Sequence, residues 1–153
     1  MPNQHTNIFV TFSPSDLAAA TAYITSLENA VPSLSILGRH QQGCDIPAAI
    51  DTSTVTLILE TFRTAASPEV QEDLLASLSK NPPNAIVRIQ LEESSCDPTS
   101  DLGTALSNCG AETVSTDLAL VEEAIERSAA LYRIQPHISE AATHNTADAS
   151  CNR

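Results

Sequence analysis

The strongest constraint on the fold is an alternation of short apolar runs with helical patterns, repeated about five times along the chain. The clearest run is "TVTLIL" at residues 54–59, where β-branched and aliphatic side chains follow one another almost without polar alternation. A strand of that composition is typical of a parallel sheet, because helices then cover both of its faces. Further strands are predicted at these positions: 7–12, 34–37, 85–91 and, more weakly, 111–114.

Helical patterns separate the predicted strands. Ser13, Pro14 and Asp16 predict a helix start, with Ser13 as N-cap and Asp16 closing a capping box. The apolar stripe that follows consists of Leu17, Ala20, Ile24, Leu27 and Val31. A second helix is predicted after Ser67, with Val70, Leu74 and Leu78 on one face, and a third over about 117–134, with Leu118, Val121, Ile125, Ser128 and Tyr132 in register. Shorter helical pieces are expected at "IPAAI" and "DLGTAL".

This alternation predicts an α/β fold, a flavodoxin-like doubly wound parallel sheet of five strands in the order 2-1-3-4-5 with helices on both faces. Ligands of such folds bind beyond the carboxyl ends of the strands. Four segments are expected along that edge: 13–16, 38–43, 60–67 and 92–97. We expect one domain over residues 6–135, a disordered N-terminus at 1–5 and a disordered polar tail at 136–153.

Charge and composition exclude several classes of function. The formal net charge is -12, with a single lysine, and a phosphate-binding protein needs clustered basic residues. Five of the 153 side chains are aromatic, too few for base stacking. No signal-peptide pattern or apolar run of about 18 residues is present, so we expect a cytoplasmic protein with no membrane insertion. Because the chain is acidic and has few aromatic side chains, we also expect no nucleic-acid partner.

Common catalytic and metal-binding motifs are missing. The four cysteines form no C-x-x-C pair, which favours free thiols and no metal site. The four glycines form neither a dinucleotide fingerprint nor a P-loop. There is no G-x-S-x-G, and His40 is the only histidine expected inside the fold. A phosphoacceptor domain is disfavoured because the single lysine does not follow the fifth strand.

The stretch "SPEVQEDLL" at 67–75 holds three carboxylates. Glu69 falls in the first turn of the predicted helix, where it interacts favourably with the helix dipole. Glu72 and Asp73 lie further along, and Ala76 and Ser77 offer them no ion pair at helical spacing. Glu69 and Asp73 even form a like-charge pair, at a cost of roughly 0.2–0.5 kcal/mol. A solvated acidic face is one interpretation, and a functional carboxylate is the other.

Four segments together resemble the Toll/interleukin receptor (TIR) domain family, of the bacterial type. "NIFVTFSPSDLAAA" resembles its first box, and "GRHQQG" stands where the family carries its BB loop. "AAIDTSTVTLILETF" and "SPEVQEDLLASL" are similar to its third strand and third helix. The resemblance covers about residues 6–134, although Glu69 stands at a tryptophan position and the aromatic third box has no counterpart beyond Tyr132.

The resemblance implies two kinds of activity. TIR domains associate with themselves or with other TIR domains in immune and defence signalling, here through the interaction loop of Gly38, Arg39, His40, Gln41, Gln42 and Gly43. Other members hydrolyse NAD, releasing nicotinamide with a glutamate of the third helix. That glutamate corresponds to Asp73, with Glu72 as the alternative, and Phe12, Ser13 and Arg39 would contact substrate. NAD would then be a substrate or a bound nucleotide, and no cofactor is expected.

Overall fold

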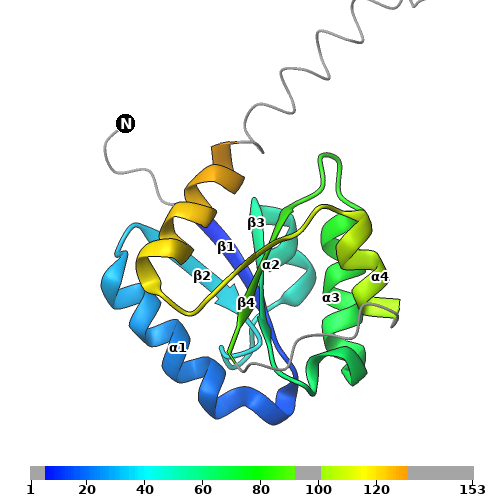
Figure 1. The fold of residues 1–153 in the computed structure, drawn as a ribbon, viewed down its shortest axis with the longest axis horizontal. Coiled ribbons are helices and arrows are strands. Elements are labelled where there is room, and N and C mark those ends of the chain that lie inside the picture. The colour runs from blue at the N-terminus through cyan, green and yellow to red at the C-terminus, as the bar shows by residue number, and fades with distance from the viewer. Residues whose placement is uncertain (1–5, 92–100, 131–153) are drawn as a thin grey trace, which may run out of the picture.

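The computed structural model describes residues 6–91 and 101–130. They form one parallel sheet of five strands in the order β2-β1-β3-β4-β5, which confirms the predicted topology (Figure 1). All four neighbouring pairs are parallel, and β1 is aligned with β2 from Thr6 opposite Leu34 to Val10 opposite Gly38. The strands are β1 (Thr6–Thr11), β2 (Leu34–Gly38), β3 (Val55–Glu60), β4 (Ala85–Gln90) and β5 (Glu112–Val114).

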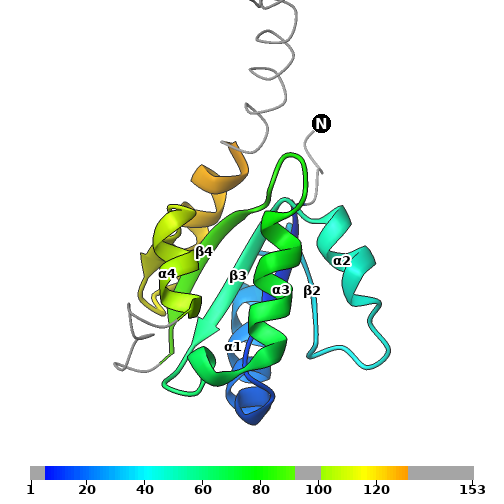
Figure 2. The same ribbon diagram turned by 90° about the vertical axis from the view of Figure 1, so that its right-hand side faces the viewer.

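Helices cover both faces of this sheet, as the apolar strands require. The helical elements are η1 (Pro14–Asp16), α1 (Leu17–Ala30), α2 (Ile46–Thr52), η2 (Thr64–Ala66), α3 (Pro68–Leu78), α4 (Asp101–Asn108) and a last helix over 118–130. One core cluster joins the sheet to α1 and the last helix, and two others join it to α2, α3 and α4. Figure 2 shows α1 on one side of the sheet and α2 and α3 on the other. The sheet is therefore sandwiched between two helical layers.

The central strand β3 is buried at all six positions, and it pairs with β1 and β4. Because all five strands are parallel, their carboxyl ends meet at one edge of the sheet. The connections 12–16, 39–45 and 61–67 leave from that edge. This arrangement brings together side chains that are far apart in the sequence.

Local details differ in part from the sequence predictions. Ser67 caps α3 as expected, since its side chain accepts a hydrogen bond from the Val70 amide. The capping box predicted for Asp16 is wrong, because neither Ser13 nor Asp16 makes a side-chain cap. Leu17 also leaves the predicted apolar stripe and is 47% exposed.

Several predictions fall outside the described residues. These are the termini 1–5 and 136–153, the edge segment 92–97, and the end of the last helix with Tyr132. Within residues 6–91 and 101–130, no helix is both long and apolar enough to cross a membrane.

Candidate functional site

Three buried carboxylates lie at the carboxyl edge of the sheet, and an arginine from another element pairs with each one. Asp73, Asp16 and Glu60 are at most 3% exposed as residues. The arginine partners are Arg39, Arg63 and Arg88 respectively. Burying a carboxylate requires such a partner, since an unpaired charge in the interior is strongly unfavourable.

Asp73 is the centre of the first pair. The Arg39 guanidinium donates to both of its oxygens, with Nε at 2.9 Å from Oδ2 and Nη2 at 2.8 Å from Oδ1. The hydroxyl of Thr11, at the end of β1, donates to Oδ2 at 2.7 Å. The hydrogen bonds from Arg39 to Asp73 are the main reason that the pKa of Arg39 is raised. A bidentate arginine fork fixes both the distance and the orientation of its partner, so the loop after β2 is fixed to α3 and β1.

Asp16 is the centre of the second pair. It accepts hydrogen bonds from the Thr61 hydroxyl at 2.6 Å and from Arg63 Nε at 2.7 Å. These contacts across 45 and 47 residues explain why Asp16 does not cap a helix. The Arg63 guanidinium also lies 4.3 Å from the ring centroid of Phe62, which is 63% exposed.

Glu60 is the centre of the third pair, within the sheet itself. It is the last residue of β3, and both of its oxygens accept hydrogen bonds from Arg88 on the neighbouring strand β4. Both partners therefore sit on rigid strands. This pair connects two strands, whereas the other two pairs connect loops to helices.

The predicted interaction loop, residues 38–43, leaves β2 beside the first pair. Gly38 is packed so closely that an added Cβ would lie 2.5 Å from the Val10 carbonyl oxygen. The loop ends at Gly43, whose φ of +76° favours glycine. Gln41, Gln42 and Gly43 are exposed, so the tip of the loop is available for contact.

His40, in the same loop, is half-buried. Its Nδ1 atom is buried and has no hydrogen-bond partner within the described residues. Burial lowers the pKa of His40, and the nearby Glu28 partly offsets this effect. The neutral imidazole is therefore favoured in the folded state.

The other predicted site residues occupy different surroundings. Phe12 is 1% exposed and belongs to the main core, so its role as a substrate contact is not supported by its position. Glu72 is on the exposed face of α3. Ser13, Arg63 and Glu69 line a hollow of about 360 Å³ between the end of β1 and the start of α3.

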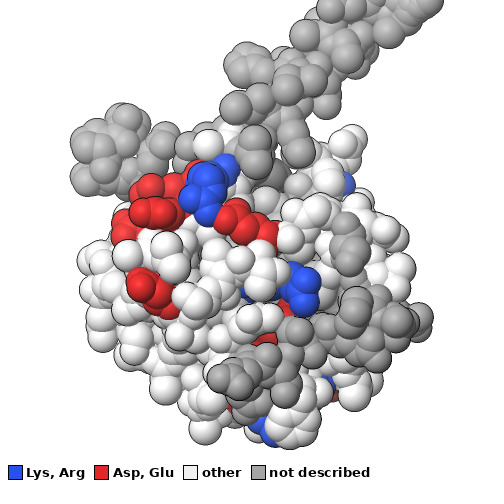
Figure 3. All heavy atoms as spheres, in the orientation of Figure 1, with Lys and Arg blue, Asp and Glu red and all other residues white. Residues whose placement is uncertain are grey.

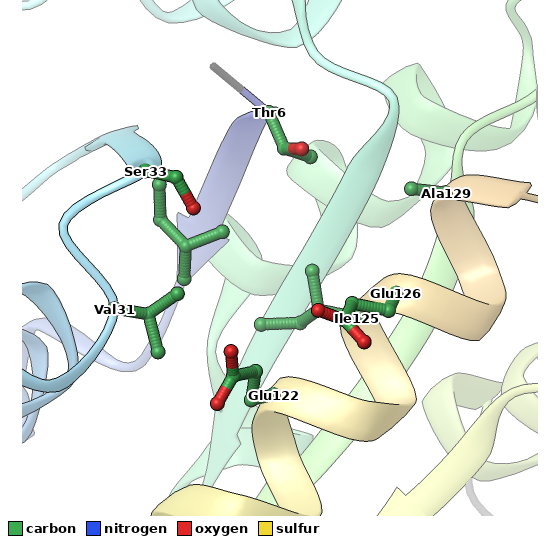
Figure 4. Close-up of a pocket in the computed structure, with 8 residues that line it drawn as sticks. Thr6, Val31, Ser33, Glu122, Ile125, Glu126 and Ala129 are labelled. Atoms are coloured by element: carbon green, nitrogen blue, oxygen red, sulfur yellow. The ribbon is translucent and has the colours of Figure 1, made fainter. Parts of the chain in front are cut away.

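The surface away from this edge is strongly acidic in places. Figure 3 shows acidic groups gathered over the last helix, which carries Glu122, Glu123 and Glu126. A second hollow of about 320 Å³ opens there at the amino edge of the sheet, between Thr6 and Ile125 (Figure 4). In the described residues, no group of three or more His, Cys, Asp or Glu side chains is arranged to hold a metal ion.

Sequence reasoning placed Asp73 and Arg39 in two separate roles and missed that they form one ion pair. A search for partners at helical spacing cannot find a contact between positions 34 residues apart. The signal that could have found it is topological: Arg39 follows β2 and Asp73 follows β3, and these two strands flank β1 and end at the same edge of the sheet. The Asp16–Arg63 pair forms for the same reason, since Asp16 follows β1 and Arg63 follows β3.

Comparison of the chain with models of known protein families and with curated proteins finds no match in either case.

Proposed function

We propose that this protein is a TIR-like interaction module that associates with itself or with other TIR domains through residues 38–43, in immune or defence signalling. The observation that carries the proposal is the bidentate contact between Arg39 and Asp73. The free thiols of Cys44 and Cys109 suit a reducing compartment, which supports a cytoplasmic setting.

The Arg39–Asp73 pair gives the loop a preformed shape. Gly38 holds one end against β1, Arg39 attaches the loop to α3, and the exposed tip carries the neutral side chain of Gln42. A loop that is already ordered loses less conformational entropy on binding, which favours association. The tip also adds no further negative charge to a chain with a net charge of -12.

The same contacts disfavour the alternative activity, NAD hydrolysis. A carboxylate that acts on the ribose must reach the substrate, as the carboxylates of glycosidases do. Asp73 is 2% exposed, and Arg39 and Thr11 occupy its oxygens. Aspartate is also shorter than glutamate by one methylene. Hydrolysis would therefore require Arg39 to move away from Asp73, together with the loop of residues 38–43.

Light scattering over a concentration series tests the interaction surface. The exposed tip variant Gln42→Glu should weaken association, because each interface would then bring added negative charges together. The matched control Ala22→Glu adds the same charge on the exposed face of α1 and should leave association unchanged. Equal behaviour of the two variants would exclude the loop as the contact surface.

Incubation with NAD separates the two activities. We expect no nicotinamide release at any protein concentration, including those at which the protein is assembled. Release that disappears in Asp73→Ala but persists in Glu72→Ala would contradict the proposal and identify an enzyme. Calorimetric titration with NAD and ADP-ribose then distinguishes binding without turnover from no binding.

A further inference from the structure

The two outer strands of the sheet are protected to different degrees. Exposed strand edges pair with other chains unless they are short, charged or covered. β5 has three residues, and its Glu112 forms an ion pair with Arg127. β2, at the other margin (Figure 2), has five residues, "LSILG", with no charge and no proline. β2 is therefore the outer strand whose sequence permits pairing with a strand of another chain.

The direction of the β2 backbone groups follows from its pairing with β1. The Thr6 amide donates to the Ser33 carbonyl at 3.2 Å, so the odd-numbered residues of β2 face β1. The backbone groups of Leu34, Ile36 and Gly38 therefore point away from the sheet. These three residues supply the three amides and three carbonyls of the outer edge.

Most of these outer groups are already bonded within the chain. The Gln41 side chain takes the place of a neighbouring strand: its Nε2 donates to the Ile36 carbonyl at 3.4 Å, and its Oε1 accepts from the Gly38 amide at 3.3 Å. The Gln41 amide donates to the Gly38 carbonyl, and the Leu34 amide donates to the Val31 carbonyl. Within the described residues, the Leu34 carbonyl and the Ile36 amide have no hydrogen-bond partner.

These two groups flank Ser35 and form a self-complementary pair. Under a two-fold axis at Ser35, each Ile36 amide can donate to the Leu34 carbonyl of a second copy, in the manner of an antiparallel ladder. We infer that β2 pairs antiparallel with β2 of a second copy of this chain, centred on Ser35, and joins the two sheets edge to edge. The inference rests on the proposed self-association and names a second surface for it.

A second copy fits this edge better than a long extended peptide. A peptide strand running along β2 would need the groups that Gln41 and Val31 occupy. Two-fold pairing needs only the two central groups. Ser35 is small, and opposed residues at such a position approach to about 4.5 Å between Cα atoms. A hollow of about 460 Å³ beside Ser35 and Glu28 leaves room for the approach.

Disulfide trapping tests the geometry directly. In a full-length chain with its four cysteines (44, 96, 109 and 151) changed to serine, Ser35→Cys should form a disulfide-linked dimer under mild oxidation. Thr25→Cys, on the exposed face of α1, is the matched control and should link far less. Equal linking by both variants would overturn the inference.

A charge at the axis gives the second test. Ser35→Glu should weaken dimerisation at least about tenfold, because like charges then face each other across the axis. Ser35→Gln has the same size without the charge and should dimerise more tightly than Ser35→Glu. Thermal unfolding checks that both variants fold. If both associate equally, the inference is wrong.

The outcomes separate the two surfaces. Association that persists in Ser35→Glu and is lost in Gln42→Glu supports the loop and overturns pairing through β2. The reverse result supports β2 and excludes the loop. A wild-type chain that stays monomeric at every concentration contradicts both.

Discussion

Replacing Arg39 with methionine leaves the carboxylate of Asp73 buried without its counter-charge. Removing one partner of a buried ion pair typically costs about 3–5 kcal/mol in the free energy of unfolding. We expect the lower end, about 3 kcal/mol, because the Arg39 side chain is 29% exposed and water can reach the vacated space. That is a large share of the roughly 5–15 kcal/mol that stabilises a typical domain.

Urea unfolding measures this loss, and two further variants make it specific. The double variant Arg39→Met with Asp73→Leu removes both charges and leaves only the Thr11 hydroxyl without its acceptor. Its free energy of unfolding should therefore be only about 1 kcal/mol below that of the wild-type chain, and so about 2 kcal/mol above that of Arg39→Met. Arg127→Met breaks an exposed pair with Glu112 and should cost less than about 1 kcal/mol. A double variant no more stable than Arg39→Met would refute the reasoning.

Two predictions concern other residues at the same edge. NMR titration should give His40 a pKa below its usual value, because burial disfavours the imidazolium. Between the folded and unfolded pKa values the unfolded chain then binds more protons, so the contribution of His40 to stability falls as the pH drops below about 6.5. His40→Gln should reduce that pH dependence, and an unchanged slope in urea unfolding would count against it. Gly38→Ala should destabilise the fold by about 1–3 kcal/mol, since the new methyl group would overlap the Val10 carbonyl. Gly43→Asn, where nothing lies within 4 Å and asparagine tolerates a positive φ, should cost less than about 1 kcal/mol, and equal losses would contradict the packing explanation.

The sequence predicted most of the fold because the relevant signals are local. Unbroken apolar runs such as 54–59 are typical of a parallel sheet covered on both faces. Five such strands in one domain suit the doubly wound order 2-1-3-4-5, and the structure confirms that order. The cap at Ser67 was predictable for the same reason, since its partner lies three residues away. The strand and helix boundaries differ from the predictions by one or two residues where both are described, except that α1 begins at Leu17, three residues after the predicted start, because Pro14–Asp16 form the separate turn η1.

The candidate site was predicted less well because its contacts are long-range. Asp16 looked like a helix cap, yet its carboxylate bonds to residues 45 and 47 positions away. The TIR resemblance implied that Phe12 contacts substrate, yet its side chain is 1% exposed and packs in the main core with Ile8 and Val10. The role of Gln41 at the edge of β2 depends on the orientation of individual backbone groups, which no sequence pattern records.

Sedimentation velocity of the wild-type chain over a wide concentration range tests the central claim, self-association, most directly. We predict that the mean sedimentation coefficient rises with concentration, and rises further with added salt, because salt screens the repulsion between chains of net charge -12. A single species of 16.2 kDa at every concentration and salt level would contradict the account.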